Sequence, residues 1–296
     1  MKTNRLTHLA LVATLVAGLA VTAGCGNNST STVTGPGNGG GSNGAPALPS
    51  TSTMKFQIDL FGVQPPVADP QSIQSGKPSA NMVQAAQVAG DHTNFITAYV
   101  QALYAQFLVY DALEEPIGAF AAAIHSVPQA QQDGSYLWTY IFVDNTIEYS
   151  VFLYGTPQTD RVMWRLEVSS NDPALPLDHF KWFDGETMND ESSGFWQFYE
   201  SADTTSEQQT ARIDWSHGAT DSLSVSINGA SQPDVGNLLV FSQSATQGSV
   251  TYTDASAATT SSILWFVDGS GSITAPDYNS GAKACWDTNQ VNTVCP

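Results

Sequence analysis

Few side chains in this sequence stand at spacings that favour catalysis. Asp214, Ser216 and His217 have the residue types of a catalytic triad and are near neighbours in the chain. Successive side chains of a strand point to opposite faces, and His217 stands at the end of the expected strand, so we do not expect a triad. A G-x-S-x-G match at residues 40–44 lies in a low-complexity stretch, without the strand and helix that such a nucleophile requires. We therefore assign no catalytic residues.

Metal ligands are also poorly spaced. No HExxH motif or close pair, as a zinc site would use, occurs among the four histidines after residue 25: His92, His125, His179 and His217. The densest group of oxygen ligands spans residues 184–191, but it lacks the EF-hand order of ligands. A solvated hairpin loop explains this acidic segment better than a calcium site. We predict no metal ion and no cofactor.

Cys285 and Cys295 enclose nine residues near the end of the chain. In an oxidising compartment this spacing predicts a local disulfide, worth about 2–3 kcal/mol on the loop-entropy model. Two cysteines cannot by themselves make a structural zinc site.

The first 25 residues predict export. Lys2 and Arg5 form a short positive segment, and an uncharged apolar run of 13 residues, 9–21, follows. A membrane-spanning helix needs about 20 residues, so this run is typical of a signal peptide that is removed. The residues Thr22-Ala23-Gly24-Cys25 resemble the lipobox of bacterial lipoproteins, although Thr22 stands where leucine is commonest.

The resemblance covers only residues 1–25. It implies that the signal peptide is residues 1–24 and that Cys25 is acylated, and several acyl chains anchor a protein stably where one does not. Gly26 follows the cysteine, which in the enterobacterial sorting pattern implies the outer membrane if the host has one. We thus expect an exported protein held on a bilayer of the cell envelope. The alternative is ordinary cleavage after a small residue, with Cys25 unmodified.

Charge excludes one class of partner. Without Lys2 and Arg5, 7 basic residues stand against 27 acidic ones, a net charge of −20. Nucleic-acid binding needs a basic footprint, which this composition lacks. The charge itself indicates a solvated acidic surface.

The remaining chain divides into a tether and one domain. Residues 25–52 are mainly Gly, Ser, Thr, Asn and Pro and predict a flexible tether. Residues 53–296 predict a single α+β domain that begins with a helical zone over 79–124. One helix runs from Ser79 to Val88, a second begins at Asp91 or Thr93, and Pro116 fits the first turn of a third, 117–124. The second helix carries an apolar stripe of Phe95, Tyr99, Leu103, Phe107 and Tyr110.

From residue 135 the apolar pattern has a period of two, as in half-buried antiparallel strands. We count about nine strands over 135–285, without the long crossover helices of a parallel nucleotide-binding sheet. The predicted fold is therefore a curved antiparallel sheet, half-barrel or barrel-like, packed against the helical zone.

Two predicted strands, 136–143 and 147–154, are apolar on both faces, so both faces must be covered. The helices can cover one face, and the other needs a second sheet, a closed barrel interior or an apolar ligand. The side chains that we expect to contact such a ligand are Trp138, Tyr140, Phe152 and Phe107.

Three functions of different classes remain open. The first is a non-catalytic binder of an apolar or amphiphilic ligand, whose architecture is similar to the half-barrel lipoprotein carriers of bacterial envelopes at the level of fold alone. The second is a structural or adhesive surface domain that recognises glycans or proteins through some of its seven tryptophans. The third is a hydrolase with a dispersed site. Protein partners cannot be named.

Overall fold

The computed structural model describes residues 44–50, 90–144, 146–174, 176–203, 206–229, 232 and 234–296. They belong to two compact units. Unit 1 comprises Met1–Lys55 and Ala112–Gln209, and unit 2 comprises Phe56–Asp111 and Thr210–Pro296. The predicted signal peptide, Cys25 and the predicted helix over 79–88 lie outside the described residues. No helix in the described ranges is long and apolar enough to span a membrane.

Part of the predicted tether packs on unit 1. Within residues 44–50, Ala45 is only 3% exposed, and the backbone N–H of Ser50 donates a hydrogen bond to Glu191 at 3.3 Å. This short stretch therefore lies against the domain.

The long helix α3 (Thr93–Ala123) begins where the sequence predicts a cap. Asp91 accepts hydrogen bonds from the backbone N–H of Thr93 at 3.0 Å and from its hydroxyl at 2.6 Å. Phe95 of the predicted stripe is buried, while the side chains of Phe107 and Tyr110 lie outside the described part. Most of the buried residues of α3 in the described part are alanines, whose small side chains let the helix approach the strands closely: Ala98, Ala102, Ala105, Ala119 and Ala123.

The prediction that Pro116 starts a separate helix is wrong, because Pro116 lies inside α3. Proline removes the hydrogen bond to residue 112 and crowds that carbonyl, which costs an isolated helix about 3 kcal/mol. Leu113 and Phe120, on either side of the proline, are each 1% exposed. Their burial in the core of unit 1 keeps the turns helical across the proline.

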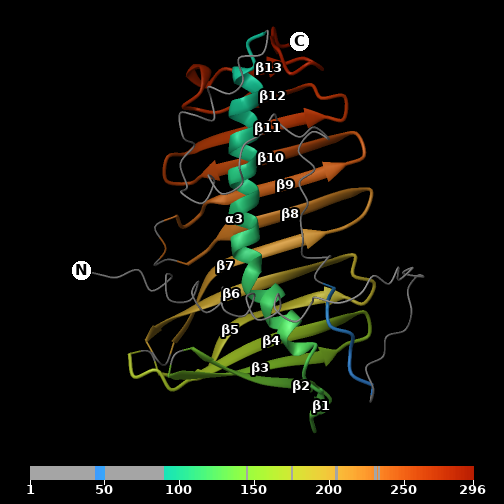
Figure 1. Cartoon of the computed structure of the whole chain (residues 1–296), viewed down its shortest axis with the longest axis vertical. Helices are drawn as coiled ribbons and strands as arrows, with labels where there is room; N and C mark the ends of the chain where they lie inside the picture. Colours follow the sequence, from blue (N-terminus) through green and yellow to red (C-terminus); the bar gives the residue numbers. More distant parts are fainter. Residues whose placement is uncertain are drawn as a thin grey trace. The chain divides into compact units, whose positions relative to one another are not determined.

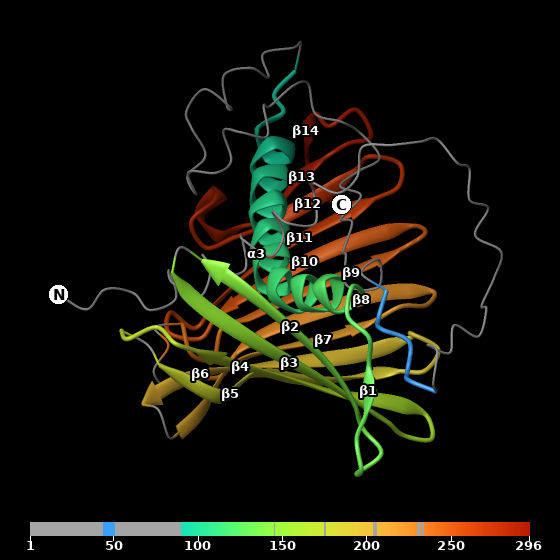
Figure 2. The same cartoon turned by 60° about the horizontal axis from the view of Figure 1, so that its bottom comes forward.

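The strands follow one another in a fourteen-stranded sheet in the order of the chain, β1 to β14 (Figures 1 and 2). The ladders of the described strands are antiparallel, which confirms an α+β fold with an antiparallel sheet. The strands are β1 (Gln129–Ala130), β2 (Tyr136–Asp144), β3 (Ile147–Pro157), β4 (Arg161–Ser170), β5 (Leu177–Met188), β6 (Ser193–Asp203), β7 (Ser206–Ser216), β8 (Thr220–Ile227), β9 (Leu238–Ser244), β10 (Gln247–Asp254), β11 (Thr259–Phe266), β12 (Gly271–Thr274), β13 (Ala284–Trp286) and β14 (Asn292–Thr293).

The predicted number of strands, about nine, is too low. Four strands, β1, β12, β13 and β14, have only two to four residues each. A segment of that length is too short to show a period of two, so the pattern reveals only the longer strands.

In unit 1 the C-terminal turns of α3 cover one face of the strands, which we call the inner face (Figure 2). The ring of Phe120 lies 5.0 Å from that of Trp164 and 5.2 Å from that of Trp196. One inner-face row crosses β2 to β6 in register and is buried throughout: Trp138, Leu153, Leu166, Phe183 and Phe198. The opposite side of these strands is the outer face.

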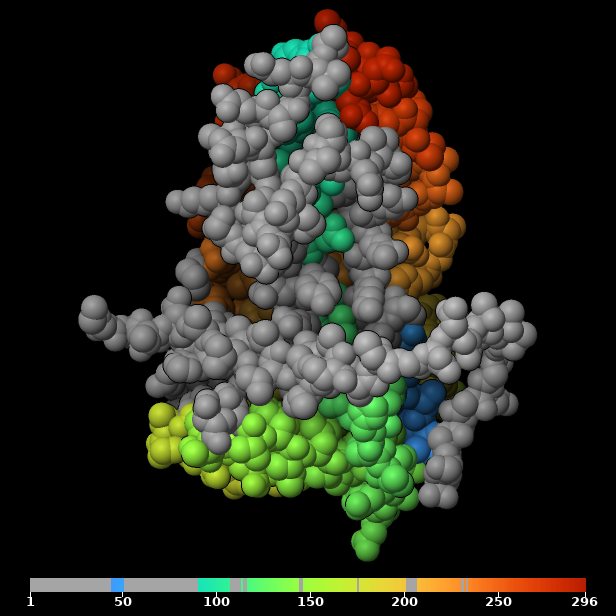
Figure 3. Space-filling view, in the orientation of Figure 1, coloured from blue at the N-terminus to red at the C-terminus, as the bar shows by residue number. Residues whose placement is uncertain are grey.

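Unit 2 has the same arrangement, and the N-terminal part of α3 crosses its strands on one side (Figure 1). Teal atoms of the helix are visible from that side in Figure 3. Phe95 of the helix contacts the ring of Trp286 edge-on at 5.9 Å. Leu223, Phe241 and Val250 form part of a buried row across β8 to β10. The residues on either side of these three are partly exposed, as the alternation predicts, and all of them except Val240 are serines or threonines.

Tryptophans and glycines alternate across neighbouring strands, and we call each such row a tryptophan–glycine ladder. A Cβ atom added to Gly248 would lie 2.1 Å from the ring of Trp265, and one added to Gly155 would lie 2.7 Å from the ring of Trp164. Glycine is therefore required where the indole crosses the next strand. The rows are Gly155, Trp164, Gly185 and Trp196 in unit 1, and Gly248, Trp265, Gly271 and Trp286 in unit 2.

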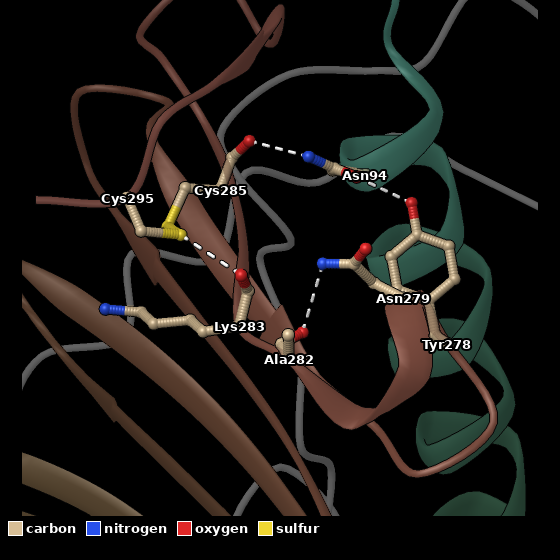
Figure 4. The surroundings of a disulfide bond; sticks show 7 residues. All are labelled: Asn94, Tyr278, Asn279, Ala282, Lys283, Cys285 and Cys295. Atoms are coloured by element: carbon tan, nitrogen blue, oxygen red, sulfur yellow. Dashed lines mark hydrogen bonds between the residues drawn. A yellow bond between two sulfur atoms is a disulfide. The ribbon is translucent and has the colours of Figure 1, made fainter.

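The predicted disulfide between Cys285 and Cys295 is present, which confirms that pairing (Figure 4). The carbonyl of Cys285 accepts a hydrogen bond at 2.8 Å from the side-chain amide of Asn94 in the first turn of α3. Asn94 in turn accepts the hydroxyl of Tyr278 at 2.6 Å. The disulfide loop is thus attached to the start of the helix.

Candidate functional site

The predicted ligand-contacting residues lie on different faces of the sheet. Trp138 is 3% exposed on the inner face, 6.0 Å from the ring of Trp164. Tyr140 is on the same face, and its hydroxyl donates to the carbonyl of Ala119 at 3.5 Å. Phe152 is on the outer face, where it pairs with Glu167 of β4. The side chain of Phe107 lies outside the described part, so these residues do not form one wall in the described structure.

The register of β2 and β3 explains why both strands are apolar on two sides. Val151 pairs with Tyr140 and is 2% exposed in the core, on the face opposite to Ile141. Phe152, on the outer face, stacks on the ring of His179 at 4.4 Å. The inner apolar side chains therefore pack beneath α3, and Phe152 is covered by an imidazole ring.

Phe152 belongs to a chain of contacts that we call the outer-face cluster: Tyr154, Arg165, Glu167, His179 and Phe152. The guanidinium carbon of Arg165 lies 4.7 Å from the centre of the Tyr154 ring, and its Nε lies 3.2 Å from Glu167. The other carboxylate oxygen of Glu167 lies 3.1 Å from Nδ1 of His179. One carboxylate is thus held between two basic side chains, each of which lies against an aromatic ring.

Bulges in β5 bring His179 to this position. The register with β4 shifts twice, once between Leu166 and Glu167 and once between Val168 and Ser170. His179 lies opposite the second shift with φ of 49°, and its backbone N–H donates to the hydroxyl of Ser169 at 2.9 Å. Because a bulge re-aims a side chain, the imidazole lies over Phe152 on the neighbouring strand but one.

A second group of the same kind lies beside the cluster on β5 and β6. The amine of Lys181 lies 3.8 Å from the centre of the Tyr199 ring and 3.1 Å from both Asp184 and Glu207. The hydroxyl of Tyr199 donates to Asp184 at 3.0 Å. The outer face of unit 1 therefore repeats one arrangement, in which an aromatic ring, a cation and a carboxylate contact one another.

Three pKa values at the outer face are raised by their surroundings. Burial raises the pKa of Tyr154, and the charge of Glu167 adds to the effect. Burial and the charge of Asp184 raise the pKa of Tyr199. Burial alone would lower the pKa of Lys181, but hydrogen bonds to Glu207 and Asp184 outweigh it and raise that pKa. At neutral pH these groups are thus two neutral phenols and a protonated amine, which suit hydrogen bonding and stacking.

The residues considered for catalysis have other partners. Asp214 accepts three hydrogen bonds from Arg212, of which the longest is 3.0 Å. The hydroxyl of Ser216 lies 2.8 Å from that of Ser222, and Nδ1 of His217 lies 3.4 Å from Asp221. The three residues therefore do not form a triad.

The acidic segment 184–191 is likewise engaged by protein groups. Asp184 contacts Lys181, Glu186 lies 3.0 Å from Arg161, and Asp190 accepts the N–H of Ser192. In the ranges that the structure describes, no three His, Cys, Asp or Glu side chains are placed to hold a metal ion.

Sequence reasoning missed Arg165, Glu167 and His179, which look like the polar half of an ordinary alternating strand. One signal was available in β5. Trp182 and Phe183 are adjacent, buried and aromatic, which breaks the period of two and marks a bulge. No protein-family model, curated protein or solved structure matches the chain, so its function is inferred from this geometry.

Proposed function

We propose that this protein is a non-catalytic lipoprotein of the bacterial cell envelope, anchored through acylated Cys25, whose outer face on unit 1 binds a glycan. The anchoring part rests on the lipobox-like residues 22–25 and the signal peptide before them. The glycan part rests on the outer-face cluster. It develops the second of the three functional hypotheses, with different residues as the contacts.

The observation that carries the proposal is the pairing of flat rings with polar groups on an exposed face. A sugar ring has apolar C–H faces and a polar edge of hydroxyls, so it needs a flat surface beside hydrogen-bonding groups. The imidazole of His179 lies on Phe152 with its side chain 52% exposed, and Glu167, Arg165 and Tyr154 lie beside it. The tryptophans do not serve this purpose, because all seven are 9% exposed or less.

Glycan binding is tested with the exported Cys25→Ser protein on an array of envelope and plant polysaccharides. Phe152→Ala and His179→Ala should each weaken binding about tenfold, because the imidazole of His179 is the flat surface and the Phe152 ring supports it from below. His125→Ala is the matched control, since His125 is an exposed histidine of the same unit that lies in the turn after α3, outside the strands. Failure of the wild-type cluster to bind any array member, or equal loss in the control, would contradict the proposal.

The anchor has a separate test. Cys25→Ser should move the protein from the membrane fraction to the soluble fraction, because the acyl chains are lost. Immunoblots of fractionated cells from its own host measure this. A variant that still pellets with membranes would show that another contact holds the protein there.

The second candidate function is binding of an apolar ligand by a half-barrel sheet, the form that the half-barrel lipoprotein carriers have. It is favoured by Ile141 and Val143, which are 60% and 56% exposed on the outer face of β2. Native mass spectrometry of protein from its host should then show bound lipid, and Ile141→Glu should remove it. If the wild type carries no lipid and binds no apolar fluorescent probe, this candidate fails.

A further inference from the structure

The geometry points to an acidic glycan as the ligand of the outer-face cluster, with Arg165 as the residue that binds its carboxylate. The inference rests on the proposed glycan function and adds the charge of the ligand. It depends on how the arginine and lysine side chains in the described part of unit 1, Arg161, Arg165 and Lys181, use their N–H donors.

Arg161 and Lys181 are fully engaged by carboxylates of the protein. Arg161 donates to both oxygens of Glu186 at 3.1 and 3.0 Å and to both oxygens of Asp160 at 3.0 Å. Lys181 has Asp184 and Glu207 at 3.1 Å. Neither side chain needs a ligand to satisfy its charge.

Arg165 is different. Within the described part of the chain its only ion pair joins Nε to Glu167 at 3.2 Å, and its side chain is 51% exposed. Asp184 stands opposite Arg165 in the β4–β5 ladder, but that carboxylate contacts Lys181 and Tyr199 instead. A guanidinium has five N–H donors, so the contacts of Arg165 with Glu167 and Tyr154 leave donors that a ligand can use.

The position of this guanidinium suits a carboxylate. Tyr154 lies against it and Glu167 holds the Nε edge, so the opposite edge is held in one orientation. Two parallel N–H groups of an arginine match the two oxygens of a carboxylate, and they bind it more strongly than neutral donors do. The imidazole of His179 lies on the far side of Glu167 and offers the flat surface for the sugar ring. A uronic acid residue presents both groups, a ring face and a carboxylate on its edge.

The test compares acidic oligosaccharides with their own methyl esters, which differ only in the charge of the carboxyl group. The probes are oligosaccharides of homogalacturonan, alginate and hyaluronan, titrated calorimetrically into the exported Cys25→Ser protein. At least one acid form should bind about tenfold or more tightly than its ester. Arg165→Ala should abolish this preference, and Arg165→Lys should restore part of it, because lysine keeps the charge without the paired donors.

Arg161→Ala is the matched control, since it removes an arginine from the same strand and face whose donors are already used. It should keep the preference for the acid form. A partly unfolded variant would weaken acid and ester alike, so the ratio of the two affinities is insensitive to folding. Equal binding of acid and ester, or an unchanged ratio in Arg165→Ala, would overturn the inference and leave the glycan proposal standing. If neither form binds and the array is also negative, both fail.

Discussion

Gly248→Ala tests the tryptophan–glycine ladder with a single methyl group. The new Cβ would lie 2.1 Å from Cζ2 of Trp265, 2.2 Å from Cε2 and 2.6 Å from Nε1, where ordinary contact begins at 3.4 Å. The indole would have to retreat by about 1.3 Å, as the shortest of these contacts shows. Trp265 is 3% exposed and packs beside Phe241, so it has little room to move.

The cost follows from two opposing effects. Overpacking a dense core typically costs about 1–3 kcal/mol. Alanine loses less backbone freedom than glycine on folding, which returns about 0.5–1 kcal/mol. We expect a net loss of about 1–2 kcal/mol, a fall in unfolding temperature of roughly 2–8 °C for a chain of this size.

Differential scanning fluorimetry and urea unfolding measure the loss against Gly218→Ala. Apart from residue 218 itself and its two neighbours in the chain, no atom lies within 4 Å of a Cβ added at Gly218, so that variant should be neutral or slightly stabilised. Combining Gly248→Ala with Trp265→Leu should cost less than the sum of the two single changes, because the methyl group occupies space that the indole vacates. Equal stability of the two alanine variants, or strict additivity in the double variant, would refute this account of the ladder.

Two further predictions concern the disulfide and the turns. Cys295→Ser should lower the free energy of unfolding by about 2–3 kcal/mol on the loop-entropy model. It should also speed amide hydrogen exchange at the start of α3, because Asn94 donates a hydrogen bond to the carbonyl of Cys285. Unchanged exchange there would show that the disulfide loop does not support the helix. In five turns, a serine or threonine two residues after an aspartate donates hydrogen bonds to it and lowers its pKa below the ordinary value of 3.8: Asp91, Asp133, Asp190, Asp254 and Asp268. The stabilisation from these hydrogen bonds is therefore present above pH 3.8 and is lost as the pH falls through the lower pKa of the folded state. Asp268→Asn, which keeps a carbonyl acceptor, should show a shallower acid-induced fall in unfolding temperature than the wild type, and identical acid limbs would count against the turn contribution.

Alternation of apolar residues was enough to predict longer strands such as β4, in which the buried residues recur with a period of two. In β4, Val162, Trp164 and Leu166 are buried as their spacing predicts. The disulfide was also predictable, since two cysteines near each other in a chain that is expected to be exported have few other uses. Both features depend on residues that are close in sequence.

Features that depend on contacts between distant residues were not predictable. Proline at residue 116 indicates a helix end on local grounds, and only the burial of Leu113 and Phe120 overrides it. The pairing of Tyr140 with Val151 depends on the hairpin register, where a shift of one residue reverses every side chain. A sequence shows that both strands are apolar on two sides without showing which residues share a side.

The outer-face cluster depends on two features of the sheet, the alternation of side chains along β4 and the bulge in β5. Strand alternation assigns even residues of β4 to the core and odd residues to the outer face, so Trp164 and Leu166 stabilise the fold while Arg165 and Glu167 face solvent. If the proposed glycan function holds, changes at odd positions of a regular strand should alter binding with little effect on stability. His179 is different, because its φ of 49° has a backbone cost that its contacts with Ser169 and Phe152 must offset. Changes at these contacts should therefore affect stability as well. This strained residue lies on an exposed face and completes the chain of rings and charges on which the proposed glycan function rests.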